Sequence, residues 1–92
     1  MSKAEFRDWV LRQGYLLYSG NRWQRDKRTS TGGIRTTRYV LAGEQVEFAE
    51  EWISWERYRK TGKVPMWWET KWTWTLDKLR LNPATDRLIF LE

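Results

Sequence analysis

Eight tryptophans stand in a chain of 92 residues that contains no cysteine and no histidine. This length suits one domain, and without cysteine the domain must be stabilised by its hydrophobic core rather than by disulfides or zinc. The absence of histidine removes the usual general base and imidazole metal sites as well. Because one tryptophan side chain buries roughly 150–250 Å², tryptophan is expected to form much of the core of a single domain over residues 1–92.

The first predicted element is a helix over residues 3–13. Ser2 and Glu5 have the spacing of a capping box, in which the hydroxyl and the carboxylate each accept a backbone N–H at the start of a helix. Apolar side chains then recur at helical spacing, at Phe6, Trp9 and Val10.

A β-hairpin is predicted next. Residues 22–28 and 34–41 are strand-like runs on either side of a Gly-Gly turn, and β-branched residues are frequent in the second run. A short apolar run at residues 15–18 is a further candidate strand, and residues 19–21 end it as a turn.

A second helix is predicted over residues 46–60. On a helical wheel its apolar side chains share one broad half, and its glutamates, Glu47, Glu50 and Glu51, lie on the other. Acidic residues early and basic residues late match the helix dipole, and Gly62 and Pro65 follow as stops.

The C-terminal third returns to a period of two. Alternating aromatic and threonine residues predict a strand from Trp68 to Leu76, a break near Asp77, a turn at residues 82–85 and a closing strand at residues 87–91. With short connections throughout, the pattern predicts an α+β fold: an antiparallel sheet of four to five strands with two helices packed on one face.

The expected sheet and helix faces place six tryptophans in the core: Trp9, Trp52, Trp55, Trp68, Trp72 and Trp74. Trp67 and Trp23 differ, because Trp67 must face away from Trp68 in an extended strand and Trp23 lies inside a basic segment. We expect both to contribute to a partner surface, together with Tyr39 or Tyr58, although core packing is an alternative for either tryptophan.

The positive charge is concentrated in the predicted hairpin. The chain carries 17 Lys or Arg and 12 Asp or Glu, a formal net charge of +5. The hairpin alone holds six cations against Asp26, and the predicted binding residues are therefore Arg22, Trp23, Arg25, Lys27, Arg28, Arg35, Arg38, Tyr39 and Trp67. Arginine forks suit phosphate geometry. The alternative is a solvated hairpin whose cations only discourage edge-to-edge aggregation.

No catalytic constellation is recognisable. The carboxylates fit helix-solubilising and turn positions, and residues 31–33 lack the Lys-Ser/Thr of a phosphate loop. We therefore expect no enzymatic activity, no cofactor and no metal site. No apolar run approaches the roughly 20 residues of a membrane span, and the first residues lack the core of a signal peptide, which favours a cytoplasmic protein without membrane contact.

The segment from Gly20 to Val40 with the acidic start of the next helix resembles the arm-binding modules of phage integrases, which hold DNA with a small sheet and a helix. The whole chain also resembles, in size and character, small phage-encoded inhibitors of host defence, among them proteins that block CRISPR surveillance complexes. That second resemblance carries no residue roles.

Two functions are therefore expected. The first is an inhibitor of phage or mobile-element origin that docks on a host ribonucleoprotein and blocks nucleic-acid binding. The alternative is an autonomous DNA- or RNA-binding module, such as a regulator or recombination accessory factor. In either case the partners are protein subunits or a nucleic-acid backbone, and a monomer is favoured over a homodimer.

Overall fold

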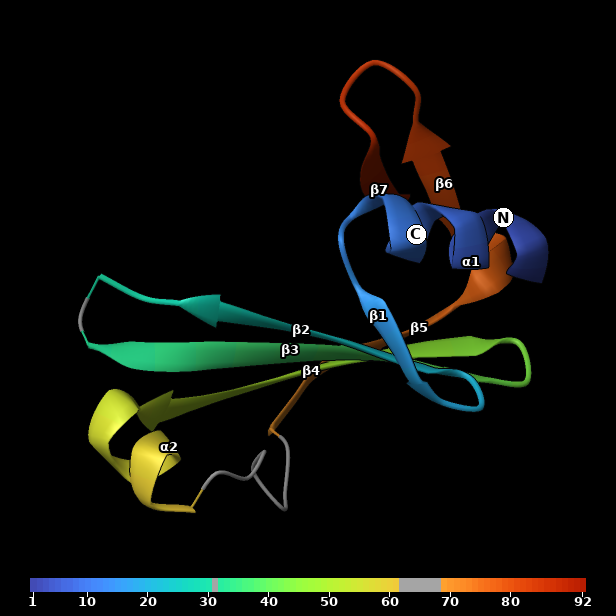
Figure 1. The fold of residues 1–92 in the computed structure, drawn as a ribbon. Helices are drawn as coiled ribbons and strands as arrows, with labels where there is room; N and C mark the ends of the chain where they lie inside the picture. Colours follow the sequence, from blue (N-terminus) through green and yellow to red (C-terminus); the bar gives the residue numbers. More distant parts are fainter. Residues whose placement is uncertain (31, 62–68) are drawn as a thin grey trace.

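The computed structural model describes residues 1–30, 32–61 and 69–92, and it has an α+β fold with two antiparallel sheets (Figure 1). In chain order the elements are α1 (Lys3–Arg12), β1 (Leu16–Ser19), β2 (Arg22–Arg28), β3 (Gly33–Ala42), β4 (Gln45–Ser54), α2 (Trp55–Thr61), β5 (Glu69–Thr75), the 3₁₀ helix η1 (Leu76–Lys78), β6 (Leu79–Asn82) and β7 (Arg87–Phe90).

The main sheet is a five-stranded meander in the order β1-β2-β3-β4-β5, and β6 and β7 pair separately. Strands β3 and β4 pair without interruption from Gly33 opposite Ser54 to Ala42 opposite Gln45. Strand β1 covers β2 only as far as Gln24, so the rest of β2 is an open edge. The sheet therefore extends as a three-stranded arm beyond α1 (Figure 1).

The core lies on the face of the sheet that carries Tyr39, which we call the first face. Side chains of α1, including Phe6 and Trp9, pack there against Tyr39, Leu41 and the residues around them. The ring of Tyr39 lies 5.7 Å from that of Phe6 and 5.5 Å from that of Trp9, both edge-on. Edge-on aromatic pairs add to the stability from burial, so this cluster fixes α1 on the sheet.

The opposite face, which carries Ile34 and Ile53, is the second face. Both isoleucines are buried, and α2 lies on this side of the sheet, against β3 and β4 (Figure 1). The two predicted helices therefore do not share one face: α1 packs on the first face, and the short α2 on the second.

The predicted helix over residues 46–60 is wrong for most of its length. Residues 45–54 form β4, and only Trp55–Thr61 is helical. Strand β4 is internal to the sheet, so its apolar residues alternate onto both faces: Val46 and Phe48 on the first, Ala49 and Ile53 on the second. Apolar residues on both faces of a strand fill a broad half of a helical wheel, which explains the error.

Other predictions are confirmed. Helix α1 has the capping box, with the Glu5 N–H donating to Ser2 Oγ (3.1 Å) and the Ser2 N–H to Glu5 Oε1 (3.2 Å). The hairpin forms with β2 as predicted and β3 one residue longer at each end. The break near Asp77 is η1.

Candidate functional site

The alternation of β2 and β3 divides the cations of the hairpin between the two faces. Trp23 pairs with Tyr39, so residues of the same parity share the first face; its cations are Arg25, Lys27 and Arg35. The cations on the second face are Arg22, Arg28 and Arg38. The predicted binding residues therefore do not form one surface.

The carboxylates of strands β2 and β4 are divided unequally between the two faces of the sheet. On the second face, Asp26, Glu47 and Glu51 match the three arginines in number. On the first face, strands β2 to β4 contribute only Glu50 against three cations. Strand β5 adds Glu69 opposite Glu50, where it forms an ion pair with Lys71. Within β2 to β4, the excess of cations over carboxylates therefore lies on the first face.

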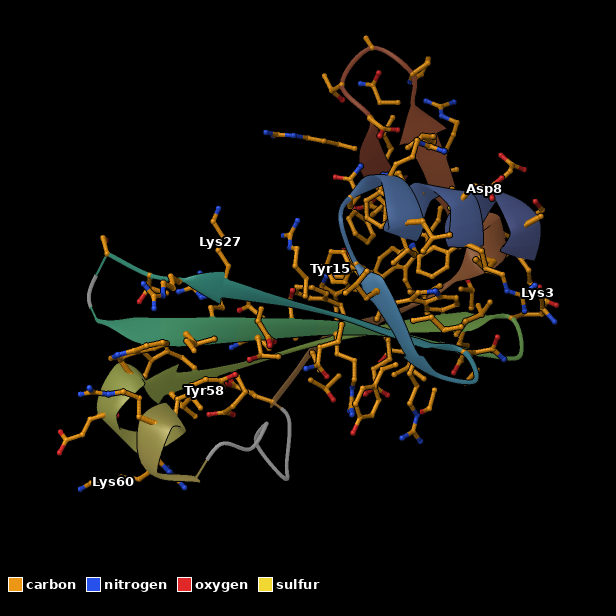
Figure 2. The ribbon with its side chains drawn as sticks, viewed as in Figure 1. Lys3, Asp8, Tyr15, Lys27, Tyr58 and Lys60 are labelled. Carbon is orange, nitrogen blue, oxygen red and sulfur yellow. The ribbon has the colours of Figure 1, made fainter. Side chains whose placement is uncertain are left out.

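Three first-face side chains lie opposite one another across the arm. Lys27 pairs with Arg35 in the β2–β3 register, and Arg35 pairs with Trp52 in the β3–β4 register. We call these three residues the cationic row. All three are exposed, and Figure 2 shows Lys27 rising from the same side of the sheet as Tyr15. Among the described residues, neither Lys27 nor Arg35 forms an ion pair or a side-chain hydrogen bond.

Trp52 is held in place although 44 % of its surface is exposed. Its indole lies on Gly33, so close that a β-carbon at position 33 would overlap the ring carbons Cε2 and Cζ2. The indole Nε1 donates a hydrogen bond of 3.3 Å to Thr29 Oγ1 at the end of the hairpin. The prediction that Trp52 belongs to the core is wrong. Trp52 lies on the first face, but its position along β4 is beyond the part of that face that α1 covers.

Arg25, the third cation of the first face, connects the sheet to α1. Its Nη1 donates to the Gln13 carbonyl at 2.7 Å, and its guanidinium lies 4.6 Å from the centre of the Tyr15 ring. Arg25 therefore separates the covered core from the exposed cationic row, and its role is at least partly structural.

On the second face, Arg28 stacks on the first residue of α2. Its guanidinium lies 4.2 Å from the centre of the Trp55 ring, and Trp55 in turn stacks on Tyr58 at 5.7 Å. A cavity of about 230 Å³ between the hairpin end and α2 is lined by Arg28, Thr29, Gly32, Gly33 and Trp55. The Trp55 N–H donates to the Gly32 carbonyl at 2.9 Å, which fixes the hairpin end to α2.

Arg38 and Arg22 differ in their surroundings. Arg38 is half-buried, and burial, aided by the positive charge of Arg22 and opposed by Glu47, lowers the pKa of Arg38. Arg22 is exposed next to it, opposite Val40. Both lie on the balanced second face, away from the cationic row.

Two predicted binding residues are buried. Trp23 is 3 % exposed and packs edge-on against Phe6 at 5.9 Å, and Tyr39 is 8 % exposed at the centre of the aromatic cluster. Burial also raises the pKa of the Tyr39 hydroxyl above its ordinary value. Trp67, the remaining predicted aromatic, lies outside the described residues, as does Trp68.

The other predicted core tryptophans are buried to different degrees. Trp9 is 6 % exposed, and Trp72 and Trp74 are half-buried against the core. Trp55 is half-buried beside Arg28.

Several exposed apolar side chains near the N-terminal end of the sheet were not predicted as a candidate site. The side chains of β1 and the end of α1 are largely exposed: Leu11 (54 %), Leu16 (74 %), Leu17 (60 %) and Tyr18 (66 %). The available signal was the stretch from Gln13 to Asn21, nine residues without a charge in a chain that is 32 % charged.

Over the part of the chain that the structure describes, no three His, Cys, Asp or Glu side chains gather as metal ligands would, and no helix is long and apolar enough to cross a membrane. No family model, curated protein or solved structure matches the chain.

Proposed function

We propose that the protein is a non-enzymatic binding protein that holds nucleic acid on the exposed part of the first face. The observation that carries the proposal is the cationic row, in which Lys27, Arg35 and Trp52 lie side by side in the strand register. Lysine and arginine contacts to phosphates supply most of the affinity of proteins for nucleic acid. An exposed tryptophan beside such cations is the composition of surfaces that also contact bases.

Protection of a sheet edge does not account for this row. Lys27 lies on the part of β2 that β1 leaves unpaired, so it would discourage strand addition there. Arg35, however, lies on β3, which is paired on both sides by β2 and β4. A cation in the middle of a sheet protects no edge, and among the described residues Arg35 has no carboxylate partner. A phosphate of a bound nucleic acid would supply the anionic partner that Arg35 lacks among these residues.

The test is charge reversal with a matched control. Lys27→Glu/Arg35→Glu changes the charge of the cationic row, and Arg80→Glu/Arg87→Glu makes the same change on exposed residues of β6 and β7. Binding of fluorescein-labelled oligonucleotides, single-stranded and duplex, is measured by anisotropy at low salt. We expect the first variant to bind about tenfold or more weakly than the wild type, and the control to stay within about threefold. Equal losses would show that only net charge matters and would contradict the proposal.

A second candidate function is inhibition of a nucleic-acid-handling ribonucleoprotein, as in the phage inhibitors that the chain resembles. The observation that favours it is the exposure of four large apolar side chains at the end of α1 and on β1, Leu11, Leu16, Leu17 and Tyr18, because apolar surface left exposed is a common feature of protein–protein contacts. An inhibitor of this class would use that surface for a protein subunit and the cationic row for the nucleic-acid path.

The second candidate is tested by affinity purification with and without nuclease. If it holds, subunits of a nucleic-acid-handling complex remain attached after nuclease treatment, and Leu17→Glu/Tyr18→Glu releases them without weakening oligonucleotide binding. Loss of all subunits on nuclease treatment would leave autonomous nucleic-acid binding as the function.

A further inference from the structure

We infer that the cationic row takes single-stranded nucleic acid, with one base stacked on the indole of Trp52 and the backbone phosphates next to it held by Arg35 and Lys27. This inference rests on the proposed function and specifies its ligand. It is carried by three features of the arm: its width, the way Trp52 is fixed, and the walls on either side of the row.

The width of the arm disfavours insertion into a duplex. The major groove of B-DNA, about 12 Å wide, admits an α-helix or a two-stranded ribbon. The hairpin β2–β3 is not a free ribbon, because β4 pairs with β3 along its whole length and α2 lies on the second face. Three strands separated by about 4.8 Å, with side chains and a helix behind them, exceed the groove. The first face instead offers an exposed platform.

Trp52 has the properties of a base-stacking side chain. Gly33 and Thr29 fix the indole before any ligand arrives, so little side-chain freedom is lost on binding. Its remaining 44 % exposure leaves apolar ring surface for a partner. In a duplex the faces of the bases are covered by their neighbours, whereas a single strand can turn a base onto an aromatic side chain.

The surroundings of the row limit the path of the strand. On one side lies the next register row, where Glu50 would repel phosphate and Arg25 is engaged with Gln13 and Tyr15. On the other side the hairpin ends, where residues 29 and 33 are joined by the Thr29 N–H, which donates to the Gly33 carbonyl at 2.9 Å. A backbone lying along the row therefore runs across the strands, from Trp52 over Arg35 to Lys27.

Such a site would discriminate little between bases, because every base has a stacking face. It would distinguish a strand with bases from a strand without them. That difference separates stacking from simple phosphate attraction.

The experiment compares ligands before it compares variants. Fluorescein-labelled dT12 and rU12, a 12-base-pair duplex, and a 12-unit abasic strand with the same phosphates are titrated against the wild-type protein. We expect dT12 or rU12 to bind at least about fivefold more tightly than both the abasic strand and the duplex. An abasic strand bound as tightly as dT12 and rU12 would overturn the stacking inference without needing any variant, and a duplex bound as tightly as either would overturn the preference for a single strand.

Variants then assign the stacking to one residue. Trp52→Leu should weaken binding of dT12 or rU12 about 5- to 150-fold, the range for loss of one stacked base, and bring it close to the affinity for the abasic strand. Trp52→Phe, which keeps an aromatic ring, should recover most of the loss. Trp55→Leu is the matched control on the second face and should stay within about twofold. Thermal unfolding monitored by circular dichroism establishes that each variant is folded.

The possible results distinguish failure of the stacking inference from failure of the proposed nucleic-acid binding. If charge reversal at Lys27 and Arg35 abolishes binding but Trp52→Leu does not change it, the stacking inference fails and the proposed function stands. If the wild-type protein binds none of the oligonucleotides at low salt, both fail.

Discussion

The indole of Trp52 occupies the space above Gly33 that a side chain at position 33 would need. Arg35 follows two residues later on β3 and lies opposite Trp52 in the register, so the close approach of the indole to the backbone and the exposed cation belong to one surface. An aromatic side chain that covers a strand glycine compensates for the missing β-carbon. Gly33 and Trp52 are therefore expected to depend on each other.

We expect Gly33→Ala to lower the free energy of unfolding by about 1–3 kcal/mol, because the new methyl group displaces the indole. In the background of Trp52→Ala the same substitution should be neutral or stabilising by up to about 1 kcal/mol, since alanine reduces the freedom of the unfolded chain. Urea denaturation of the four proteins in this double-mutant cycle measures the coupling. Equal effects of Gly33→Ala in both backgrounds would refute the contact.

The two tryptophans Trp9 and Trp52 should differ in their contribution to stability. Trp9 is 6 % exposed, and its Nε1 donates to the Asp86 carbonyl at 2.7 Å. Trp9→Ala is therefore expected to cost about 3–5 kcal/mol, as for other core aromatics. Trp52→Ala should cost less than half as much because 44 % of the Trp52 surface is already exposed in the folded protein. Chemical denaturation measures the free energy of unfolding of both variants. Similar losses would show that Trp52 contributes to stability as a core residue does.

The buried hydroxyl of Tyr39 predicts a loss of stability at high pH. Burial raises the pKa of Tyr39 in the folded protein, whereas in the unfolded chain it has the ordinary value of about 10. Above that pH the unfolded chain releases the proton and the folded protein keeps it, so the free energy of unfolding falls by up to about 1.4 kcal/mol per pH unit.

Tyr39→Phe keeps the ring and removes the titrating group. Urea titrations between pH 7 and pH 11 should therefore show a shallower decline above pH 10 for the variant than for the wild type. Identical declines would mean that Tyr39 ionises as easily in the folded protein as in the unfolded chain.

Asp86 combines a positive backbone angle with contacts to α1. Its φ is 55°, its carboxylate accepts from Arg12 Nη2 (3.0 Å) and from Gln13 Nε2 (2.9 Å), and its carbonyl accepts from Trp9. Asp86→Ala should lower the free energy of unfolding by about 1–3 kcal/mol. Asp86→Gly loses the same side-chain contacts, but it should cost about 1–2 kcal/mol less, because only glycine adopts this φ without strain. Equal losses in denaturant titrations would show that the backbone angle is not strained.

Local signals were sufficient where neighbours in sequence decide the structure. The Ser2 and Glu5 capping box and the pairing of two strands that are close in sequence each depend on nearby residues, and both α1 and the β2–β3 pair form. The stretch from Val46 to Ser54 is different, because its strand conformation depends on pairing with β3, which local periodicity does not encode.

The candidate site shows the same division. The positive charge of the hairpin was sufficient to predict Lys27 and Arg35 as candidate binding residues. Their location on the opposite face from Arg22 and Arg28 depends on the alternation of side chains along the strands and on which face the core covers, and the sequence did not specify that face. Trp23 was predicted to lie on a partner surface and is buried, whereas Trp52 was predicted to lie in the core and is exposed, and both errors have the same cause. The side of the sheet that α1 covers ends between the Trp23–Tyr39 pair and the cationic row.

The salt dependence of oligonucleotide binding tests the role of the cationic row most directly. Each cation that neutralises a phosphate of a single strand contributes about 0.7 to the slope of log K against log salt concentration. For Lys27→Gln/Arg35→Gln we therefore expect a slope smaller by about 1.4 than that of the wild type. The control Arg80→Gln/Arg87→Gln should leave the slope unchanged. An unchanged slope in the first variant, or an equal decrease in the control, would contradict the assignment of phosphate binding to the cationic row.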